Sequence, residues 1–304
     1  MQTYLVMEKI YMPKHILVTG ANGQLGSELY ALSEQNSYDE LYFYFTDKEN
    51  LDITDKSKIG DFCKENTIKV IVNCAAYTAV DKAEEDVVNA DAINHLAVKS
   101  MAEIAKSQGI QLIHISTDYV FDGSNSIPYI EEDSVNPQGI YGKTKLDGEN
   151  AMIEICPEKS MIIRTSWVYS SFGNNFVKTM LRLGKQRDEL GVIFDQVGTP
   201  TYAKNLAESI LDIIQSQREY ESNSVEIYHY SNEGVCSWYD FAKTIFELSN
   251  IRCNVNPITT EQYPTPAKRP HYSILNKTKI KRDFKLDIPY WRDALRVCIT
   301  KLEV

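Results

Sequence analysis

The stretch ILVTGANGQLG, residues 16–26, runs from a short apolar segment through three glycines into a helical pattern. Gly20, Gly23 and Gly26 have the spacing G-x-x-G-x-x-G. Glycine permits a tight turn and lets the backbone approach a pyrophosphate at the N-terminus of the following helix. The stretch therefore predicts a dinucleotide-binding loop. The alternative is a plain turn between a strand and a helix.

Residues downstream of the glycines extend this expected site. Asp47 follows Gly26 by about 20 positions, where a carboxylate accepts hydrogen bonds from an adenosine ribose. An acid there favours NADH, while the neighbouring Lys48 offsets the repulsion of an additional phosphate, so both NADPH and NADH stay open as cofactors. Further cofactor contacts are expected from Gln24, Leu25, Asp52, Ile53, Ala75, Ala76 and Tyr77.

The first half of the chain alternates strand-like runs with helical patterns. The runs are continuously apolar, as is typical of parallel strands covered on both faces. Helical patterns lie between them, such as residues 24–35 and 92–109, and the second pattern ends at Gly109, a good helix stop. The alternation predicts right-handed crossovers and an α/β fold with a doubly wound, Rossmann-type parallel sheet. The expected strands are residues 15–19, 41–46, 69–74, 110–116 and 160–166.

The chain is expected to divide into three parts. Residues 1–12 mix charged and apolar residues without a signal-peptide core, and we expect a poorly ordered extension. Residues 13–170 form the expected dinucleotide-binding domain. From 171 to 304 the pattern loosens into a smaller, mainly substrate-binding region whose segments partly return to pack on the sheet. This region contains expected strands at 191–195 and 225–231 and expected helices at 203–217, 237–250 and 290–302.

Composition limits the classes of partner. Hydrophobic residues make up 43% and charged residues 24% of the 304 residues, as in globular proteins. No apolar run approaches the roughly 20 residues that span a bilayer, so no membrane partner is expected. A net charge of −10 argues against a nucleic-acid partner. The 6 cysteines are scattered without a C-x-x-C pair, which predicts reduced thiols, a cytoplasmic location and no zinc site.

The stretch IYGKTKLDGE, residues 140–149, places Tyr141 four positions before Lys145. Such residues share one helix face. A lysine ammonium beside a phenol favours the tyrosinate, lowers the phenol pKa and makes it a better proton donor near neutral pH. A ketone that accepts hydride from a nicotinamide becomes an alkoxide and needs such a proton, and Lys145 is also placed to hydrogen-bond the nicotinamide ribose. Taken alone, the pair is common on exposed helices.

Together with the glycine loop, these residues resemble the extended short-chain dehydrogenase/reductase family. Its catalytic set is a serine or threonine, a tyrosine and a lysine. Thr117, at the end of the fourth expected strand, matches the hydroxyl position, and Tyr141 and Lys145 match the pair. Asn94 matches an asparagine that often joins the set, although it is equally an ordinary helix residue.

Seven blocks resemble the dTDP-4-dehydrorhamnose reductases within that superfamily: NGQLGSEL, AAYTAVDKAE, STDYVFDG, YGKTKLDGE, RTSWVY, NNFVKTMLRL and YPTPAKRPHYSILN. The resemblance implies reduction of the C4 ketone of dTDP-4-dehydro-6-deoxy-L-mannose to dTDP-L-rhamnose. It also implies that Thr117 and Asp118 touch the sugar and that Tyr141 protonates the C4 oxygen. By the same resemblance Trp167 lines the sugar pocket, and Lys268 and Arg269 face the nucleotide diphosphate. Trp167 is otherwise a core aromatic, and the two cations a solvated turn.

Neighbouring functions remain as alternatives. A 4,6-dehydratase carries a glutamate after the aspartate, whereas Tyr119 follows Asp118 here. A 4-epimerase uses the same tyrosine and lysine, and a non-catalytic regulatory subunit keeps the same fold.

Some members dimerise around a metal held by glutamates. Glu28 matches the first of these, but Lys204 and Lys301 occupy the later positions, so no metal is expected and both a monomer and a homodimer stay open.

Overall fold

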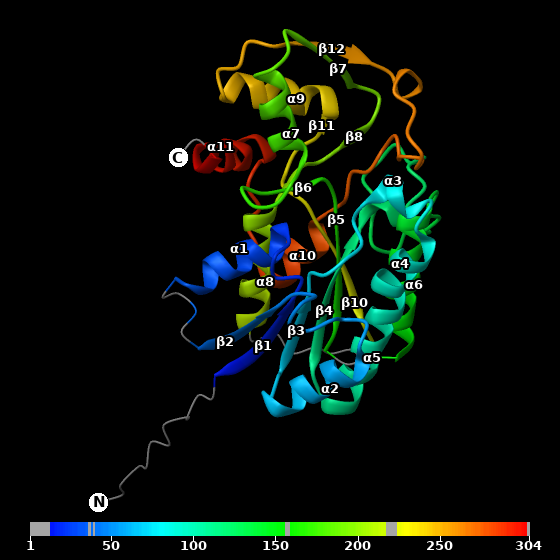
Figure 1. The fold of residues 1–304 in the computed structure, drawn as a ribbon, viewed down its shortest axis with the longest axis vertical. Coiled ribbons are helices and arrows are strands. Elements are labelled where there is room, and N and C mark those ends of the chain that lie inside the picture. The colour runs from blue at the N-terminus through cyan, green and yellow to red at the C-terminus, as the bar shows by residue number, and fades with distance from the viewer. Residues whose placement is uncertain (1–12, 36–37, 39, 156–158, 217–223, 303–304) are drawn as a thin grey trace, which may run out of the picture.

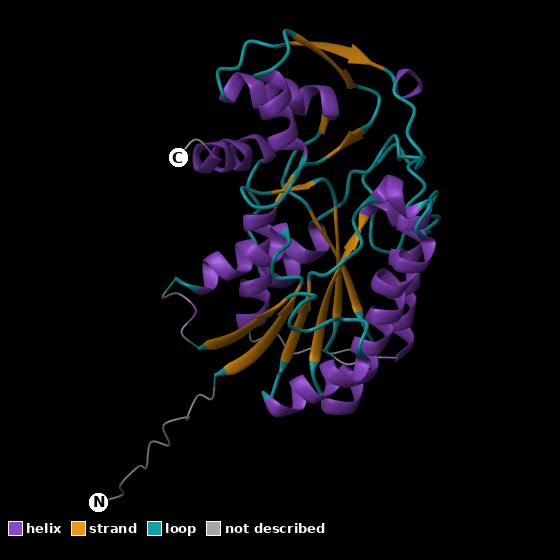
Figure 2. Cartoon of the chain, viewed as in Figure 1, coloured by secondary structure: helices purple, strands orange, loops and turns teal. Residues whose placement is uncertain are grey.

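The computed structural model describes residues 13–35, 38, 40–155, 159–216 and 224–302, so the extension expected at residues 1–12 lies outside the described residues. Within them, six strands form a central sheet in the order β10-β5-β4-β3-β1-β2 (Figure 2). All neighbouring strands are parallel. This confirms the predicted α/β fold with a doubly wound parallel sheet. The strands are β1 (Lys14–Thr19), β2 (Leu41–Thr46), β3 (Val70–Asn73), β4 (Gln111–Thr117), β5 (Met161–Thr165) and β10 (Glu226–Tyr230).

Helices cover both faces of the sheet (Figure 1). Because successive strand side chains point to opposite faces, Ile16 and Val18 of β1 pack on one side and Leu17 on the other. The first face is covered by α1 (Gln24–Ser33), α8 (Ala203–Gln215) and α10 (Thr278–Phe284). The second is covered by α2 (Lys56–Glu65), α5 (Ala97–Gln108) and α6 (Ile140–Ile155).

The strand order reverses beside β1. The chain runs from β1 through α1 to β2, then returns past β1 through α2 to β3. At such a switch point the loops that follow neighbouring strands diverge to opposite faces and leave a crevice at the carboxyl edge, where ligands bind in open α/β sheets. Gly20 follows β1, Cys74 follows β3 and Thr117 ends β4 at this edge.

A smaller layer lies above the carboxyl edge of the sheet (Figure 1). It contains α7 (Phe176–Gly184), α9 (Trp238–Leu248), α11 (Trp291–Leu302) and the 3-10 turn η4 (Thr260–Gln262). Three short strand pairs complete it: β7 (Glu189–Ile193) with β12 (Asn254–Ile258), β8 (Val197–Gly198) with β11 (Cys236–Ser237), and β6 (Val168–Tyr169) with β9 (Thr201–Tyr202). Its apolar side chains form a core of their own, whereas β10, α8 and α10 return to the main sheet.

The helical pattern over residues 92–109 has an irregular start. After α3 (Val80–Ala83) and α4 (Val87–Asp91), residues Ala92–Leu96 form a turn of π-helix before α5 begins. The wider turn buries Asn94, whose side chain bonds the backbone of Tyr77. At the other end Gly109 adopts a left-handed φ of +65°, as expected for a glycine helix stop. None of the helices in the described ranges combines the length and apolar character that a membrane crossing requires.

Candidate active site

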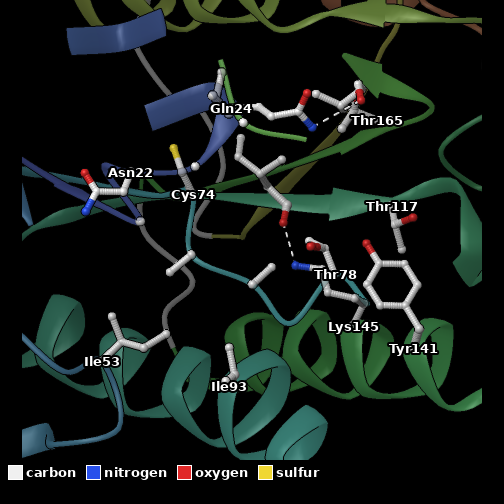
Figure 3. A pocket seen from close by; sticks show the side chains of 18 of the residues that line it. Asn22, Gln24, Ile53, Cys74, Thr78, Ile93, Thr117, Tyr141, Lys145 and Thr165 are labelled. Carbon is white, nitrogen blue, oxygen red and sulfur yellow. Dashed lines mark hydrogen bonds between the residues drawn. The ribbon is translucent and has the colours of Figure 1, made fainter. Parts of the chain in front are cut away.

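A cavity of about 1050 Å³ lies at the switch point, between the carboxyl edge of the sheet and the smaller layer. Its wall combines the glycine loop, the ends of β2, β3, β4 and β5, the first turns of α6 and the segment 173–175 (Figure 3). The sequence-predicted residues on this wall are Gly20, Gly23, Gln24, Leu25, Asp47, Asp52, Ile53, Ala75, Ala76, Thr117, Asp118, Tyr141, Lys145 and Trp167.

The glycine loop fits a dinucleotide pyrophosphate. Gly20 has a φ of +69°, and a Cβ there would lie 2.7 Å from the backbone of Ala75. A Cβ on Gly26 would collide with the carbonyl oxygen of Gly20. The N-cap of α1 is Gly23, which has no side chain to cap the first amides of the helix. These amides and the positive end of the helix dipole therefore face the cavity as a site for phosphate.

The end of β2 is shaped by hydrogen bonds to Asp47. Its Oδ1 accepts the backbone N–H groups of Glu49 and Asn50 at 2.9 and 3.2 Å. Its Oδ2 accepts the side-chain amide of Asn22 at 2.5 Å. Asp47 thereby joins the glycine loop to the turn after β2. The sequence reasoning assigned no role to Asn22, although it lies between the glycines and opens the quoted block NGQLGSEL.

Thr117, Tyr141 and Lys145 meet on the cavity wall. Thr117 ends β4, while Tyr141 and Lys145 occupy successive turns of α6. Figure 3 shows the side chains of Thr117 and Tyr141 close together at one end of the cavity, with Lys145 beside Tyr141. The ring of Tyr119 packs edge-on against Tyr141, with ring centroids 5.5 Å apart. A reacting oxygen placed between the two hydroxyls would contact both.

The pKa of Tyr141 is shifted upward, whereas the sequence predicted a downward shift. Removal of the phenol from water raises its pKa to about 12, a hydrogen bond with Thr117 lowers it, and the carboxylate of Asp118 raises it further. The expectation that Lys145 lowers this pKa was wrong for this state of the protein. The physical reason is that desolvation dominates. The helix spacing reveals a shared face but not the enclosure of that face.

Lys145 is buried and bonded to β4. Only 1% of its surface is exposed. Its Nζ donates a hydrogen bond of 2.6 Å to the carbonyl oxygen of Ile115 and lies 3.2 Å from Nε2 of His114. Burial lowers the pKa of Lys145 to about 8, while Glu149 and Cys74 act in the opposite direction. Its ammonium is therefore a stronger acid than an exposed lysine.

One turn after Lys145, Glu149 anchors α6 to the sheet. Its carboxylate accepts hydrogen bonds from Nε and Nη2 of Arg164 of β5, and the shortest N–O distance is 2.7 Å. It also accepts the hydroxyl of Ser116 on β4. Glu149 and Arg164 are both nearly inaccessible to water. This paired charge fixes the height and rotation of the helix that presents Tyr141 and Lys145.

Asp118 and Trp167 also line the cavity. Asp118 is buried, accepts the hydroxyl of Thr117 at 3.1 Å, and its Oδ2 has no hydrogen-bond partner among the described residues. Burial raises the pKa of Asp118 to about 7. Trp167 has a left-handed φ of +48°, a strained conformation for a bulky residue, and its ring stacks on Trp238 at 3.5 Å. The two side chains offer a polar and a flat apolar contact of the kind that sugars use.

Four of the residues predicted to bind the cofactor or the substrate do not lie on this wall. Arg269 forms a two-pronged ion pair with Asp81, at 2.7 and 3.0 Å. Lys268 donates a hydrogen bond to Gln138. The other two are Gly26, behind the glycine turn, and Tyr77, whose hydroxyl bonds Asp86.

Further wall residues were not singled out from the sequence. Most are short polar or apolar side chains, and several lie within the quoted blocks, but no role was assigned to them individually. Asn94, proposed as a fourth member of the catalytic set, lies behind the wall and donates a hydrogen bond to Thr144. The missed wall residues include Cys74, Thr78, Ile93, Thr165, Ser166, Asn174 and Asn175.

Glu28 is buried next to two lysines. Ser170 donates a 2.6 Å hydrogen bond to its Oε1, and Nζ of Lys301 lies 4.0 Å from its Oε2. Burial raises the pKa of Glu28, and the charges of Lys301 and Lys204 act against that rise. Lys204 and Lys301, which occupy the positions of the metal-binding glutamates in other members, thus place positive charge near this carboxylate.

Among the described residues, one other group has the spacing of metal ligands. Asp91 of α4, His95 of the π-helical turn and Asp147 of α6 are half-buried and place their ligand atoms within 4.8 Å of one another. Lys143 already forms an ion pair with Asp147 at 2.7 Å, and His95 bonds Asp91. These contacts account for the cluster without an ion.

Comparison with known proteins adds evidence on family. Residues 14–304 match the family described as the RmlD substrate binding domain. The chain is 44% identical to the dTDP-4-dehydrorhamnose reductase of Aggregatibacter actinomycetemcomitans, over 92% of this chain and 97% of that protein.

Two solved structures are similar over their whole length. A dTDP-4-dehydrorhamnose reductase from Clostridium acetobutylicum is 44% identical, with a TM-score of 0.88, and the match covers 95% of this chain and 100% of that one. The enzyme of the same name from Bacillus anthracis, solved in complex with NADP, is 40% identical with the same TM-score and coverage.

Proposed function

Because this chain belongs to the RmlD substrate-binding-domain family, we propose that it reduces the C4 ketone of dTDP-4-dehydro-6-deoxy-L-mannose to give dTDP-L-rhamnose. The observation that carries the proposal is the meeting of a phosphate-binding glycine loop with Thr117, Tyr141 and Lys145 in one cavity. The names of the relatives at 40–44% identity support the substrate, a small nucleotide sugar.

The dinucleotide, when bound, supplies the hydride to the sugar. Its pyrophosphate would be held by the amides after Gly23, and its adenosine ribose by Asp47. NADPH is supported by the related Bacillus anthracis structure with NADP. NADH stays the alternative, because Asp47 carries a negative charge on the wall of the cavity.

The residues of the chain supply the proton and the orientation. Tyr141 gives its phenolic proton to the oxygen of the former ketone as negative charge develops there. The hydroxyl of Thr117 hydrogen-bonds the phenol of Tyr141 and holds it in position. Lys145 stabilises the resulting tyrosinate and returns a proton to it. The raised pKa keeps the phenol protonated at neutral pH, so Tyr141 holds the proton that the reaction needs, although it is a weaker acid than an exposed tyrosine.

Asp118 and Trp167 would hold the sugar. Oδ2 of Asp118 is buried without a partner among the described side chains and is available to a sugar hydroxyl. Trp167 presents a ring whose orientation is fixed by stacking on Trp238. Lys268 and Arg269 stay proposed contacts to the diphosphate, although Arg269 would have to share its guanidinium with Asp81.

We further propose a cytoplasmic protein, a monomer or a homodimer, that holds no metal at Glu28. The reduced-thiol composition and the positive charges of Lys204 and Lys301 near that carboxylate support this.

The test is turnover by the purified protein. Freshly generated keto-sugar nucleotide is mixed with NADPH or NADH, loss of reduced nicotinamide is followed by absorbance, and the product is identified by NMR. We expect oxidation of one equivalent of cofactor for each dTDP-L-rhamnose formed. A product with the opposite configuration at C4 and no net cofactor consumption would indicate a 4-epimerase. A wild-type protein that is inert with both cofactors while it binds a partner enzyme would indicate a regulatory subunit.

A further inference from the structure

A chain of buried polar side chains runs beneath the cavity, across three neighbouring strands. Thr19 of β1 pairs in register with Asn73 of β3, which pairs with His114 of β4. The hydroxyl of Thr19 lies 2.7 Å from Oδ1 of Asn73, and Nδ2 of Asn73 lies 3.0 Å from Nδ1 of His114. Nε2 of His114 lies 3.2 Å from Nζ of Lys145. All four side chains are at least 99% buried, so each polar atom must find its partner inside the protein.

One backbone amide fixes the direction of this chain. The N–H of Ala75 can only donate, and it points at the side chain of Asn73 at 3.2 Å. The atom of Asn73 that faces Ala75 must therefore be the acceptor, Oδ1. This orientation turns the amide nitrogen of Asn73 toward His114. Because that nitrogen is also a donor, Nδ1 of His114 must accept the hydrogen bond and carries no proton.

The tautomer of His114 follows from this. A neutral imidazole with a free Nδ1 carries its proton on Nε2. A doubly protonated ring would place Nδ1–H against the N–H of the Asn73 amide, so two donors would face each other. Burial together with the charge of Lys145 also holds the pKa of His114 well below its ordinary value. The N–H of Nε2 therefore points at Nζ of Lys145. An ammonium cannot accept that hydrogen bond, whereas a neutral amine can.

We propose that Asn73 and His114 are positioning residues that act through Lys145. Asn73 selects the Nε2–H tautomer of His114, and His114 then favours the neutral amine of Lys145 over its ammonium. Lys145 keeps its hydrogen bond to the carbonyl oxygen of Ile115 in both forms. The arrangement makes the lysine a readier source of protons than its burial alone would.

Other titratable groups around Lys145 also affect the equilibrium between its ammonium and its neutral amine. On its own helix Glu149 favours the ammonium, but that carboxylate is already paired with Arg164 of β5. In the loop after β3, Cys74 acts in the same direction as Glu149. The other titratable groups on this wall are Tyr141 of α6, Asp118 and Tyr119 after β4, and Asp47, Lys48, Glu49 and Asp52 at and after the end of β2. The donor that opposes the ammonium directly is Nε2–H of His114.

The consequence for proton delivery rests on the proposed function. Tyr141 loses its phenolic proton to the oxygen of the former ketone and becomes a tyrosinate. The ammonium of Lys145 releases a proton that reaches the tyrosinate through an intervening water or ligand hydroxyl, and it becomes a neutral amine, which accepts the hydrogen bond of His114. The amine takes a proton from solvent after the product leaves. The proton count is balanced, and His114 keeps its own proton throughout.

The direct test is nitrogen NMR of the histidine rings in the intact, isotope-labelled protein, with the His114 signals assigned by their loss in His114→Gln. We expect an unprotonated Nδ1 and a protonated Nε2 between about pH 6 and pH 8. A protonated Nδ1, or an imidazolium in that range, would overturn the proposal. This measurement needs neither cofactor nor substrate, so the proposed function can fail while the tautomer assignment holds, and the reverse.

A kinetic test separates tuning from a merely structural role. In His114→Gln, the side-chain oxygen of the glutamine can accept a hydrogen bond from the ammonium of Lys145. In Asn73→Asp, the carboxylate accepts from Nδ1–H of His114, so Nε2 is unprotonated and can accept from the ammonium instead. We expect the alkaline limb of the activity profile to move upward by roughly half to one pH unit in both variants. The exposed His271→Gln serves as the matched control and should leave the limb in place. Loss of activity at every pH with an unmoved limb would contradict the proposal.

Discussion

At the scale of single residues, the site combines groups whose ionisation is shifted by burial in opposite directions. Asp118 is held toward its protonated form and Lys145 toward its neutral form. Both shifts reduce the charge in the cavity before a ligand enters. The sequence identified both residues, but it gave no measure of their enclosure, so the direction of these shifts could not be read from it.

The stability of the protein should depend on the ionisation of Asp118. Its pKa rises from 3.8 in the unfolded chain to about 7 in the folded protein. The stabilisation of the folded state by the protonated carboxyl is therefore complete below about pH 4 and is lost as the pH rises through about 7. Relative to Asp118→Asn, wild type should lose on the order of 4 kcal/mol of unfolding free energy across that range. Urea unfolding at several pH values measures this, and parallel curves would contradict it.

Glu28 allows a second prediction at this scale. Because Lys301 and Lys204 place positive charge near its carboxylate, no cation is needed to neutralise it. Turnover should be unchanged after treatment with EDTA, with untreated protein in the same buffer as the control. Strong loss of activity with EDTA that magnesium restores would show that a metal is used.

At the scale of elements, the sequence predicted the main sheet well because continuous apolar runs are a strong local signal. The expected strand at 41–46 coincides with β2, and the five strands expected in the first half all appear in the sheet. The π-helical turn at Ala92–Leu96 was missed, since its cause is the bond between Asn94 and the distant backbone of Tyr77. The expected strand at 191–195 begins earlier, at Glu189, and pairs with β12 outside the main sheet.

Helix α6 offers a matched pair of tests. Glu149→Gln leaves the guanidinium of Arg164 buried with a weakened partner, and we expect a loss of about 3–5 kcal/mol of unfolding free energy. Asp147→Asn removes an exposed ion pair with Lys143 on the same helix, and the expected loss is below about 1 kcal/mol. Equal losses in denaturant titrations would contradict the anchoring role of Glu149.

At the scale of the whole molecule, the smaller layer is tied to the dinucleotide-binding part by side chains far apart in sequence. Gln24 bonds Asn175, and Asp81 pairs with Arg269. This is why the sequence could not decide which cations face the cavity. Whether Arg269 is free depends on an acid 188 positions away, and no local pattern reports such a contact.

The Asp81–Arg269 pair should show coupling between these two parts. In a double-mutant cycle with Asp81→Asn and Arg269→Gln, we expect a coupling of about 0.5–1 kcal/mol in unfolding free energy, a modest value because both side chains are partly exposed. Strictly additive losses would show that the pair does not join the two parts. A separate rise in substrate KM for Arg269→Gln alone would support its proposed contact with the diphosphate.

The most direct measurement of the central claim, that Tyr141 is the proton donor, is a single-turnover experiment with Tyr141→Phe. The variant is saturated with NADPH and mixed with keto-sugar nucleotide, with Tyr42→Phe, an exposed tyrosine of β2, as the control. The account predicts that cofactor binding is retained and that the rate of nicotinamide oxidation falls by at least about 100-fold. Oxidation as fast as in wild type, with the same product, would contradict it.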